Sequence, residues 1–377
     1  MQISRTAALL TAGTLVAVAG CGTSDKGDDA AGGPIKVTAS EDGCKLGKTE
    51  LAAGTHTFEV RNSGSQVTEF YVYAPGDRIM GEVENIGPGL SRKLIVELQA
   101  GKYEGACKPG MTGKGIREAL TITGEAPAHV TTDAKLAEAT KSYQRYVKSQ
   151  SAALIDKTTE FVAAIKAGDQ AKAKTLFPVA RTYWERIEPV AEIFGDLDPA
   201  IDGREDTVEP GQQFTGYHKL EKDLWATKDI SKSGPIADKL LVDVKKVVEL
   251  ANSTTLTPVQ LANGSKELLD EVATGKVTGE EDRYSHTDLW DFQANVEGSQ
   301  GAIAALRPVL EERDPALVKQ IDERFAAVDA ALAKHAKGAG FKFYNELTPA
   351  DVKELSTVID AVGEPVSKVA AVVAAKK

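Results

Sequence analysis

Histidine and cysteine are scarce in this chain of 377 residues, which contains five histidines and three cysteines. Because these residues supply the soft and borderline ligands of proteins, any metal site must rely largely on carboxylates. Positive charge is also short, since 45 lysines and arginines face 55 aspartates and glutamates, a formal net charge of −10. An acidic surface repels phosphate backbones, which makes nucleic acid a poor partner and a cation a better one.

The chain is too long for one ordinary domain and fits two or three. Hydrophobic residues make up 42% of it and charged residues 27%. Both values are typical of globular proteins and exclude wholesale disorder.

The apolar run near the N-terminus is too short to span a bilayer comfortably. It follows Arg5 and covers residues 7–18, which is typical of a signal-peptide core. The run ends in Val-Ala-Gly-Cys21, which resembles a lipobox, where the cysteine is lipidated before the signal is removed. The alternative is plain secretory cleavage, with Cys21 inside the discarded peptide. We expect a signal peptide over residues 1–20 and a flexible tether over residues 21–33.

Removing residues 1–20 takes away one arginine and no acid, so 44 basic residues face 55 acidic ones and the net charge becomes −11. The sequence therefore predicts an extracytoplasmic protein, lipid-anchored to the cell membrane through Cys21, in the periplasm or cell envelope.

Two regions with different patterns of apolar residues follow the tether. Residues 34–124 alternate apolar and polar side chains between turn signals, which predicts about seven short strands in an all-β Greek-key sandwich. Residues 130–377 repeat apolar side chains every three to four positions, which predicts an all-α domain of two four-helix bundles. The expected helices cover residues 136–165, 169–194, 213–228, 235–252, 258–275, 287–306, 314–336 and 349–375.

The strand region resembles the cupredoxin family. Cys107 and Met111 match the ligand loop of blue-copper proteins, whereas Glu69 stands where those proteins place their first histidine, and no histidine lies between Cys107 and Met111. Without imidazole ligands an electron-transfer copper site is not expected. Two alternatives remain for the cysteines of this region: a Cys44–Cys107 disulfide, or a divergent site for copper or zinc built from Glu69, Cys107, Met111 and Cys44.

The helical region contains a candidate metal-binding pair, His218 and Glu221, in the sequence Gly-Tyr-His-Lys-Leu-Glu. Their spacing of three places both side chains on one helix face, where they can hold one cation. Together with Phe-Gly-Asp-Leu-Asp before it and Tyr-Ser-His-Thr-Asp-Leu after it, this motif resembles the imelysin, or M75, family. A cupredoxin-like domain ahead of such a bundle resembles the EfeO-type iron-uptake family.

The resemblance implies that His218 and Glu221 bind metal, and an iron shell needs further hard ligands. We expect these among acids of neighbouring segments, where Asp202 and Asp206 have helix capping as an alternative role. The candidates are Glu188, Asp202, Asp206, Asp243 and Glu281.

The resemblance also implies a function: capture of ferric or ferrous iron and delivery to a membrane permease, with a secreted haem peroxidase of the dye-decolourising type as second partner. Two other hypotheses stay open, an M75 zinc metallopeptidase and metal-bridged binding of an acidic polysaccharide. The motif offers one histidine and one glutamate, whereas a zinc peptidase needs three ligands, a water and a base. The sequence therefore favours a binding protein over an enzyme.

Overall fold

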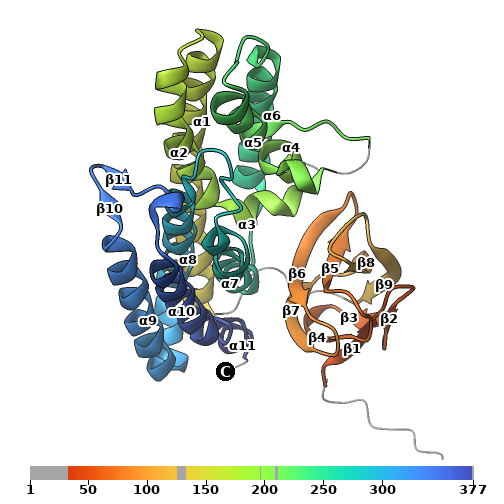
Figure 1. Ribbon diagram of the computed structural model, residues 1–377. Helices are drawn as coiled ribbons and strands as arrows, with labels where there is room; N and C mark the ends of the chain where they lie inside the picture. Colours follow the sequence, from red (N-terminus) through yellow and green to blue (C-terminus); the bar gives the residue numbers. More distant parts are fainter. Residues whose placement is uncertain (1–32, 125–132, 196, 209–210, 376–377) are drawn as a thin grey trace, which may run out of the picture. The chain divides into compact units, whose positions relative to one another are not determined.

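The computed structural model describes residues 33–124, 133–195, 197–208 and 211–375. The expected signal peptide, Cys21 and nearly all of the tether lie outside these residues. Figure 1 shows a β region followed in the chain by a helical region, which confirms the predicted fold class. Within the described ranges, no helix has both the length and the apolar character needed to cross a membrane.

Nine strands form two sheets within residues 33–124. They are β1 Ile35–Ala39, β2 Cys44–Leu46, β3 Glu50–Ala52, β4 Gly54–Asn62, β5 Thr68–Ala74, β6 Arg78–Ile86, β7 Ser91–Leu98, β8 Gly101–Pro109 and β9 Ile116–Thr123. One sheet has the order β2-β1-β4-β7 and the other β3-β9-β8-β5-β6. Strand pairs β1–β4 and β3–β9 are parallel, so the chain crosses between the sheets as it does in a Greek-key sandwich.

The core of the β region lies between the two sheets. Strand β1 alternates buried and exposed side chains along its whole length, as expected for a strand with one face on a core. Phe58 of β4 and Phe70 of β5 are fully buried, and their ring centroids lie 5.6 Å apart. Each such side chain stabilises the fold by about 1.5–3 kcal/mol through the apolar surface it removes from water.

A disulfide joins Cys44 on β2 to Cys107 on β8 and so links the two sheets. Both sulfur atoms are used in this bond and are not available as thiolate ligands. This feature decides between the two alternatives that the sequence leaves open for the cysteines.

Replacing both cysteines by alanine should lower the free energy of unfolding of the β region by about 4 kcal/mol, because the bond closes a long loop in the unfolded chain. The sequence separation of the two cysteines is 63 residues. Urea unfolding of the full chain, followed by circular dichroism, measures the change. A loss below about 1 kcal/mol would show that the disulfide does not stabilise the fold by closing a loop in the unfolded chain.

The helical region contains two four-helix groups that share one continuous apolar core. Its α-helices are α1 Ala134–Lys166, α2 Gln170–Glu185, α3 Glu188–Ala191, α4 Leu197–Asp202, α5 Gly216–Lys222, α6 Gly234–Ser253, α7 Pro258–Thr274, α8 Asp288–Arg313, α9 Pro315–Ala333, α10 Pro349–Val366 and α11 Val369–Ala374. In Figure 1, α1, α2, α5 and α6 gather at one end of the region, and α7 to α10 at the other. The 33-residue helix α1 contacts members of both groups, including α2, α6 and α8.

Capping residues and prolines set the helix starts largely where the sequence predicts them. Asp169 caps α2, and Thr257 and Thr348 form capping boxes at the starts of α7 and α10. Pro258, Pro315 and Pro349 occupy first-turn positions, where a missing N–H costs nothing.

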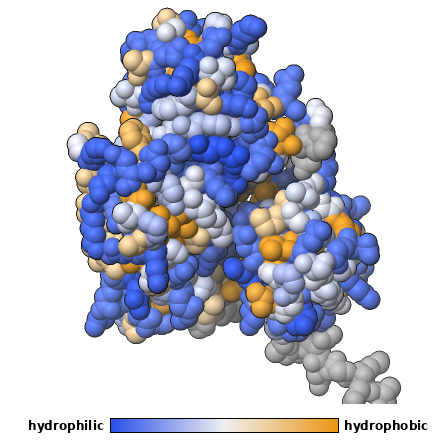
Figure 2. Space-filling view, viewed as in Figure 1, coloured by the Kyte–Doolittle hydropathy of each residue, from blue (hydrophilic) through white to orange (hydrophobic). Residues whose placement is uncertain are grey.

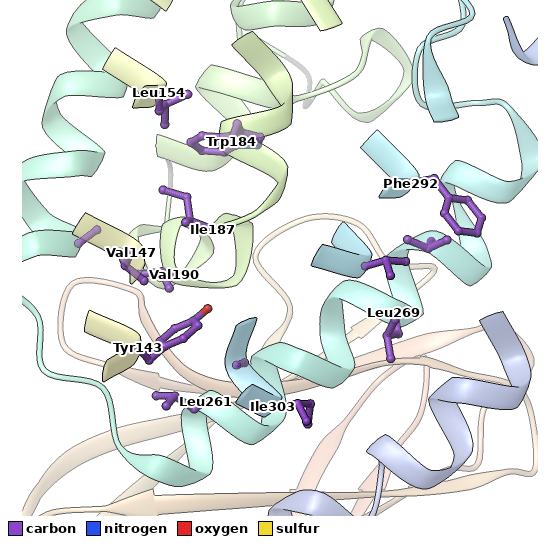
Figure 3. Packing of buried hydrophobic residues seen from close by; sticks show 14 of the residues in the cluster. Tyr143, Val147, Leu154, Trp184, Ile187, Val190, Leu261, Leu269, Phe292 and Ile303 are labelled. Carbon is purple, nitrogen blue, oxygen red and sulfur yellow. The ribbon is translucent and has the colours of Figure 1, made fainter. Parts of the chain in front are cut away.

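The interior of the helical region is apolar and closely packed. Figure 3 shows part of it, with Leu154 of α1 beside Trp184 of α2, both fully buried. The face seen in Figure 2 is hydrophilic over much of the helical region, as amphipathic helices require. Against this apolar interior, a large group of buried charged side chains stands out.

Candidate metal centre

Helix α5 carries the motif pair and is placed by a backbone contact that only glycine allows. Gly216, its first residue, has φ +80°, and a Cβ there would lie 2.1 Å from the carbonyl oxygen of Ile201. The hydroxyl of Thr215 donates to the carbonyl of Ala200, at 2.9 Å. Both contacts fix the start of α5 against α4, whose last residue is Asp202.

The imidazole of His218 is 2% exposed and faces carboxylates on both sides. Its Nδ1 lies 3.0 Å from Glu221 Oε2 and 3.9 Å from Asp282 Oδ1. Its Nε2 lies 3.2 Å from Glu281 Oε1 and 3.7 Å from Asp202 Oδ1. His218 therefore belongs to two groups that could each hold a cation, one with Glu221 and Asp282 and one with Asp202 and Glu281.

Glu221 is fully buried and is held by the segment 279–287, here called the site loop. Its Oε1 accepts hydrogen bonds from the N–H of Tyr284 at 2.9 Å, the N–H of Ser285 at 2.7 Å and the hydroxyl of Ser285 at 2.9 Å. Its Oε2 has one hydrogen-bond partner among the described residues, Nδ1 of His218. One oxygen is thus anchored, and the other points to the centre of the site.

Arg181 of α2 lies at the middle of the buried acids and is itself fully buried. Its guanidinium pairs with five carboxylates, those of Glu185, Asp202, Glu281, Asp282 and Asp291. A cation shared among so many acids neutralises only part of their charge. Isolated buried charges are costly, so the remaining acids need protons or another cation.

Negative charge exceeds positive charge throughout this buried group. Eight of its acids are less than 9% exposed: Glu185, Glu188, Asp202, Glu221, Glu281, Asp282, Asp288 and Asp291. Within the described residues, the buried cations that contact them are Arg181, Lys276 and, when protonated, His218. Carboxylate oxygens in excess around one imidazole suit a hard or borderline metal ion.

Burial and neighbouring charges shift the protonation of these groups in opposite directions. Burial and Arg181 oppose the charge on His218, but hydrogen bonds with Glu221 and Glu281 and the charge of Asp202 raise its pKa to about 10. Burial raises the pKa of Asp282 to about 8 and that of Asp288 to about 6. Although burial opposes it, Lys276 and His218 hold the pKa of Glu281 well below its usual range. In the absence of metal, His218 and Asp282 therefore both carry protons at pH 7.

A third group of acids, Glu185, Glu188 and Glu271, surrounds the ammonium of Lys276. Lys276 Nζ lies 3.3 Å from Glu185 Oε2, 3.3 Å from Glu188 Oε2 and 2.6 Å from Glu271 Oε2. A built-in cation already occupies this position. Glu188, a predicted ligand, belongs to this group and to neither of the groups that contain His218.

The other predicted ligands divide into those near His218 and those elsewhere. Asp202 and Glu281 lie beside it, as given above. Asp206 is exposed and pairs with Arg283 at 2.7 Å, and Asp243 on α6 pairs with Lys239. Neither belongs to the groups that could hold a metal ion among the described residues.

The predicted second site in the β region is not assembled. Cys44 and Cys107 are bonded to each other, and Met111 is 42% exposed at the tip of the loop between β8 and β9. Glu69 instead accepts a hydrogen bond from the hydroxyl of Tyr71, at 3.1 Å.

Two central residues, Arg181 and Asp282, are absent from the sequence-based ligand set. Asp282 stands in the acidic run Glu280-Glu281-Asp282, and the sequence does not show which of these acids face inward. Arg181 sits in an ordinary amphipathic helix, where a basic residue carries no signal for a buried role.

Tyr344 holds both ends of the site loop. Its N–H donates to the carbonyl of His286 at 2.8 Å, and its hydroxyl donates to the carbonyl of Val277 at 2.7 Å. Its ring covers Gly279, where a Cβ would come within 2.2 Å of a ring carbon and φ is +77°. Tyr344 thereby fixes the segment that presents Glu281 and Asp282.

Replacing Tyr344 by phenylalanine should speed hydrogen exchange of the amides of residues 279–287 about fivefold, because one hydrogen bond is worth about 1 kcal/mol. Hydrogen–deuterium exchange with mass spectrometry measures this. Tyr146→Phe is the matched control, because the buried hydroxyl of Tyr146 has no hydrogen-bond partner among the residues that the structure describes. Equal exchange of the site loop in the wild type and in Tyr344→Phe would show that the hydroxyl of Tyr344 does not hold this loop in place.

Both the β region and the helical region match known protein families. The model of the imelysin family matches residues 139–369, and that of the cupredoxin-like domain matches residues 10–117. The chain is 39% identical over 340 residues to proteins named iron uptake system component EfeO from Escherichia coli O157:H7, Escherichia coli K12 and Shigella flexneri. Each match covers 89% of this chain and 90% of the relative. The chain therefore belongs to the imelysin family and, with its cupredoxin-like domain ahead of the imelysin domain, is an EfeO-type protein.

Proposed function

We propose that this protein is the extracytoplasmic iron-binding component of an iron uptake system, which captures ferric or ferrous iron at the centre around His218 and delivers it to a membrane permease. The observation that carries the proposal is the buried imidazole placed between two pairs of carboxylates. Its relatives are named iron uptake system component EfeO, which supports iron as the cargo.

Anchoring and partners extend the same proposal. Lipidation of Cys21 would keep the carrier at the membrane surface, within reach of the permease, on a tether of about twelve residues. A secreted haem peroxidase is the second proposed partner. It would change the oxidation state of the iron that the carrier receives or releases.

The geometry supports a carrier more than a zinc peptidase. A peptidase needs a carboxylate free to act as a general base near an open metal position. Glu221 has one oxygen held by three donors and the other against His218. Asp202 and Glu281 are paired with arginines.

Isothermal titration of the mature protein with Fe²⁺ under anaerobic conditions, ferric citrate, Zn²⁺ and Cu²⁺ tests the proposal. We expect one tight iron site that is lost in the variant His218→Ala/Glu221→Ala. Asp243→Asn is a matched control, because its side chain pairs with Lys239 on α6. Iron binding by the double variant at wild-type strength would refute this site, and casein cleavage that disappears in the same variant would support the peptidase instead.

A further inference from the structure

The two ring nitrogens of His218 face different acids, and only one of them can hold a cation at a time. A neutral imidazole coordinates metal through one nitrogen, while the other carries a hydrogen and donates it to a neighbouring acceptor. The acids on the coordinating side become ligands, and an acid on the other side orients the ring. The surroundings of the two nitrogens therefore decide which acids do which task.

The acids on the Nε2 side already have arginine partners. Arg181 pairs with Asp202 Oδ1 and lies 3.1 Å from Glu281 Oε1, the same two oxygens that face Nε2. Arg204 NH1 lies 2.6 Å from the other oxygen, Glu281 Oε2. A metal ion on this side would have to share each facing oxygen with a guanidinium.

The acids on the Nδ1 side present oxygens with fewer partners, because only Asp282 of the two pairs with Arg181, and at a longer distance than Glu281 does. Glu221 Oε1 is anchored by the site loop, and within the described part of the chain Oε2 has His218 Nδ1 as its one hydrogen-bond partner. Asp282 is likewise anchored by one oxygen, since the hydroxyl of Thr287 donates to its Oδ2. Its Oδ1 is buried and accepts no hydrogen bond from an N–H or hydroxyl group of the described residues, although Arg181 Nε lies 3.4 Å away and the carboxyl group of Asp291 is also a neighbour of Asp282. Ligating carboxylates are held in this way in metal sites, by hydrogen bonds from outside the shell.

The spacing on the Nδ1 side also fits coordination. Neighbouring ligand atoms of an ion with bonds of about 2.1 Å lie about 3.0–3.4 Å apart. Nδ1 lies 3.0 Å from Glu221 Oε2 and 3.9 Å from Asp282 Oδ1, and ligand atoms of the three residues all lie within 4.8 Å of one another. Small shifts of the two carboxylates would bring the three atoms to coordination spacing.

We propose that the cation binds to His218 Nδ1, Glu221 Oε2 and Asp282 Oδ1, and that Glu281 accepts the Nε2 hydrogen and orients the ring. This assignment rests on the proposed function and makes it more specific. Asp282 becomes the third protein ligand, Glu281 a positioning residue, and Asp202 a partner of Arg181. An imidazole with two carboxylates leaves positions for water or for the ligands of a delivering chelate.

Nitrogen-15 NMR of the histidine-labelled mature protein, loaded with cadmium-113, tests the assignment directly. We expect a coupling from cadmium to Nδ1 of His218, with the hydrogen on Nε2. Cadmium coupled to Nε2, with the hydrogen on Nδ1, would overturn the inference and leave the proposed iron site at His218 intact. Failure of the wild type to bind Cd²⁺, Zn²⁺ or Fe²⁺ would overturn both.

Isothermal titration with Zn²⁺ gives a second, independent measurement. Asp282→Asn should lower the affinity for Zn²⁺ more than about 100-fold, because it removes a ligand. Glu281→Gln, which changes an outer-shell partner, should lower it roughly 10–100-fold. Asp202→Asn should lower it less than about tenfold. Asp223→Asn is the control, as a buried acid of the same region that accepts from Ser233 at 2.8 Å. A loss in Asp202→Asn that exceeds the loss in Asp282→Asn, with both variants folded by circular dichroism, would overturn the assignment.

Discussion

Zinc binding to the mature protein is expected to weaken about 100-fold when the pH falls from 7 to 6, because two protons must leave the site for each metal ion that enters. The pKa of His218 is raised to about 10 and that of Asp282 to about 8, so both groups are protonated in the metal-free protein below pH 8. Each displaced proton changes the affinity tenfold per pH unit.

The sign follows from the direction of both shifts. A raised pKa means that the metal-free protein holds the proton more tightly, so lower pH favours the metal-free state and promotes release. Titrations at pH 6 and 7, in two buffers of different ionisation enthalpy, give both the affinity and the number of protons released. The variant Asp282→Asn should release one proton for each metal ion bound, and its affinity for zinc should change tenfold per pH unit. If the affinity of the wild type for zinc did not change with pH, His218 and Asp282 would not both be protonated in the metal-free protein.

Replacing Arg181 by methionine should destabilise the helical region by about 3–5 kcal/mol at pH 7, because it leaves buried carboxylates without their shared cation. The guanidinium is fully buried and contacts five acids. Urea unfolding of the full chain, followed by circular dichroism, measures the loss. The loss should shrink at pH 5, because the unpaired acids can then take up protons.

Arg307→Met provides the matched control for this measurement. Arg307 also pairs with an acid, Asp322 at 2.5 Å, but the two side chains are 36% and 49% exposed. An exposed pair of this kind is worth about 0–1 kcal/mol. If Arg181→Met cost no more than Arg307→Met, the buried acids would not depend on the guanidinium.

Local sequence signals predicted most of the fold, because caps, prolines and periodicity act over a few residues. Strand alternation and helix starts such as Pro258 and Pro349 appear in the structure largely where the pattern places them. The range 287–306 predicted for one helix is too short at its C-terminal end, since α8 continues through Pro308 to Arg313. A helix packed on both sides can absorb the one hydrogen bond that a proline removes. The short hairpin of β10 (Ala336–Lys337) and β11 (Gly340–Phe341) was not predicted, because two-residue strands carry no periodic signal.

The sequence predicts the motif residues of the candidate site better than the acids that surround them. His218 and Glu221 share a helix face by spacing alone, and the structure buries both. The positions of the remaining acids depend on how distant segments meet. Asp243, a predicted ligand, pairs with Lys239 instead. Asp282 and Glu281 are neighbours in the chain but face opposite nitrogens of one ring, which only the tertiary structure reveals.

The burial of His218, at 2% exposure, has a consequence for the speed of loading. We expect the chain to open around the imidazole before a metal ion binds, and the opening rate would then cap the loading rate at high metal concentration. The same barrier slows escape once the centre has closed. In the proposed function, a carrier built in this way would hold its cargo for the time between two openings, and a partner that promotes opening would set the moment of transfer.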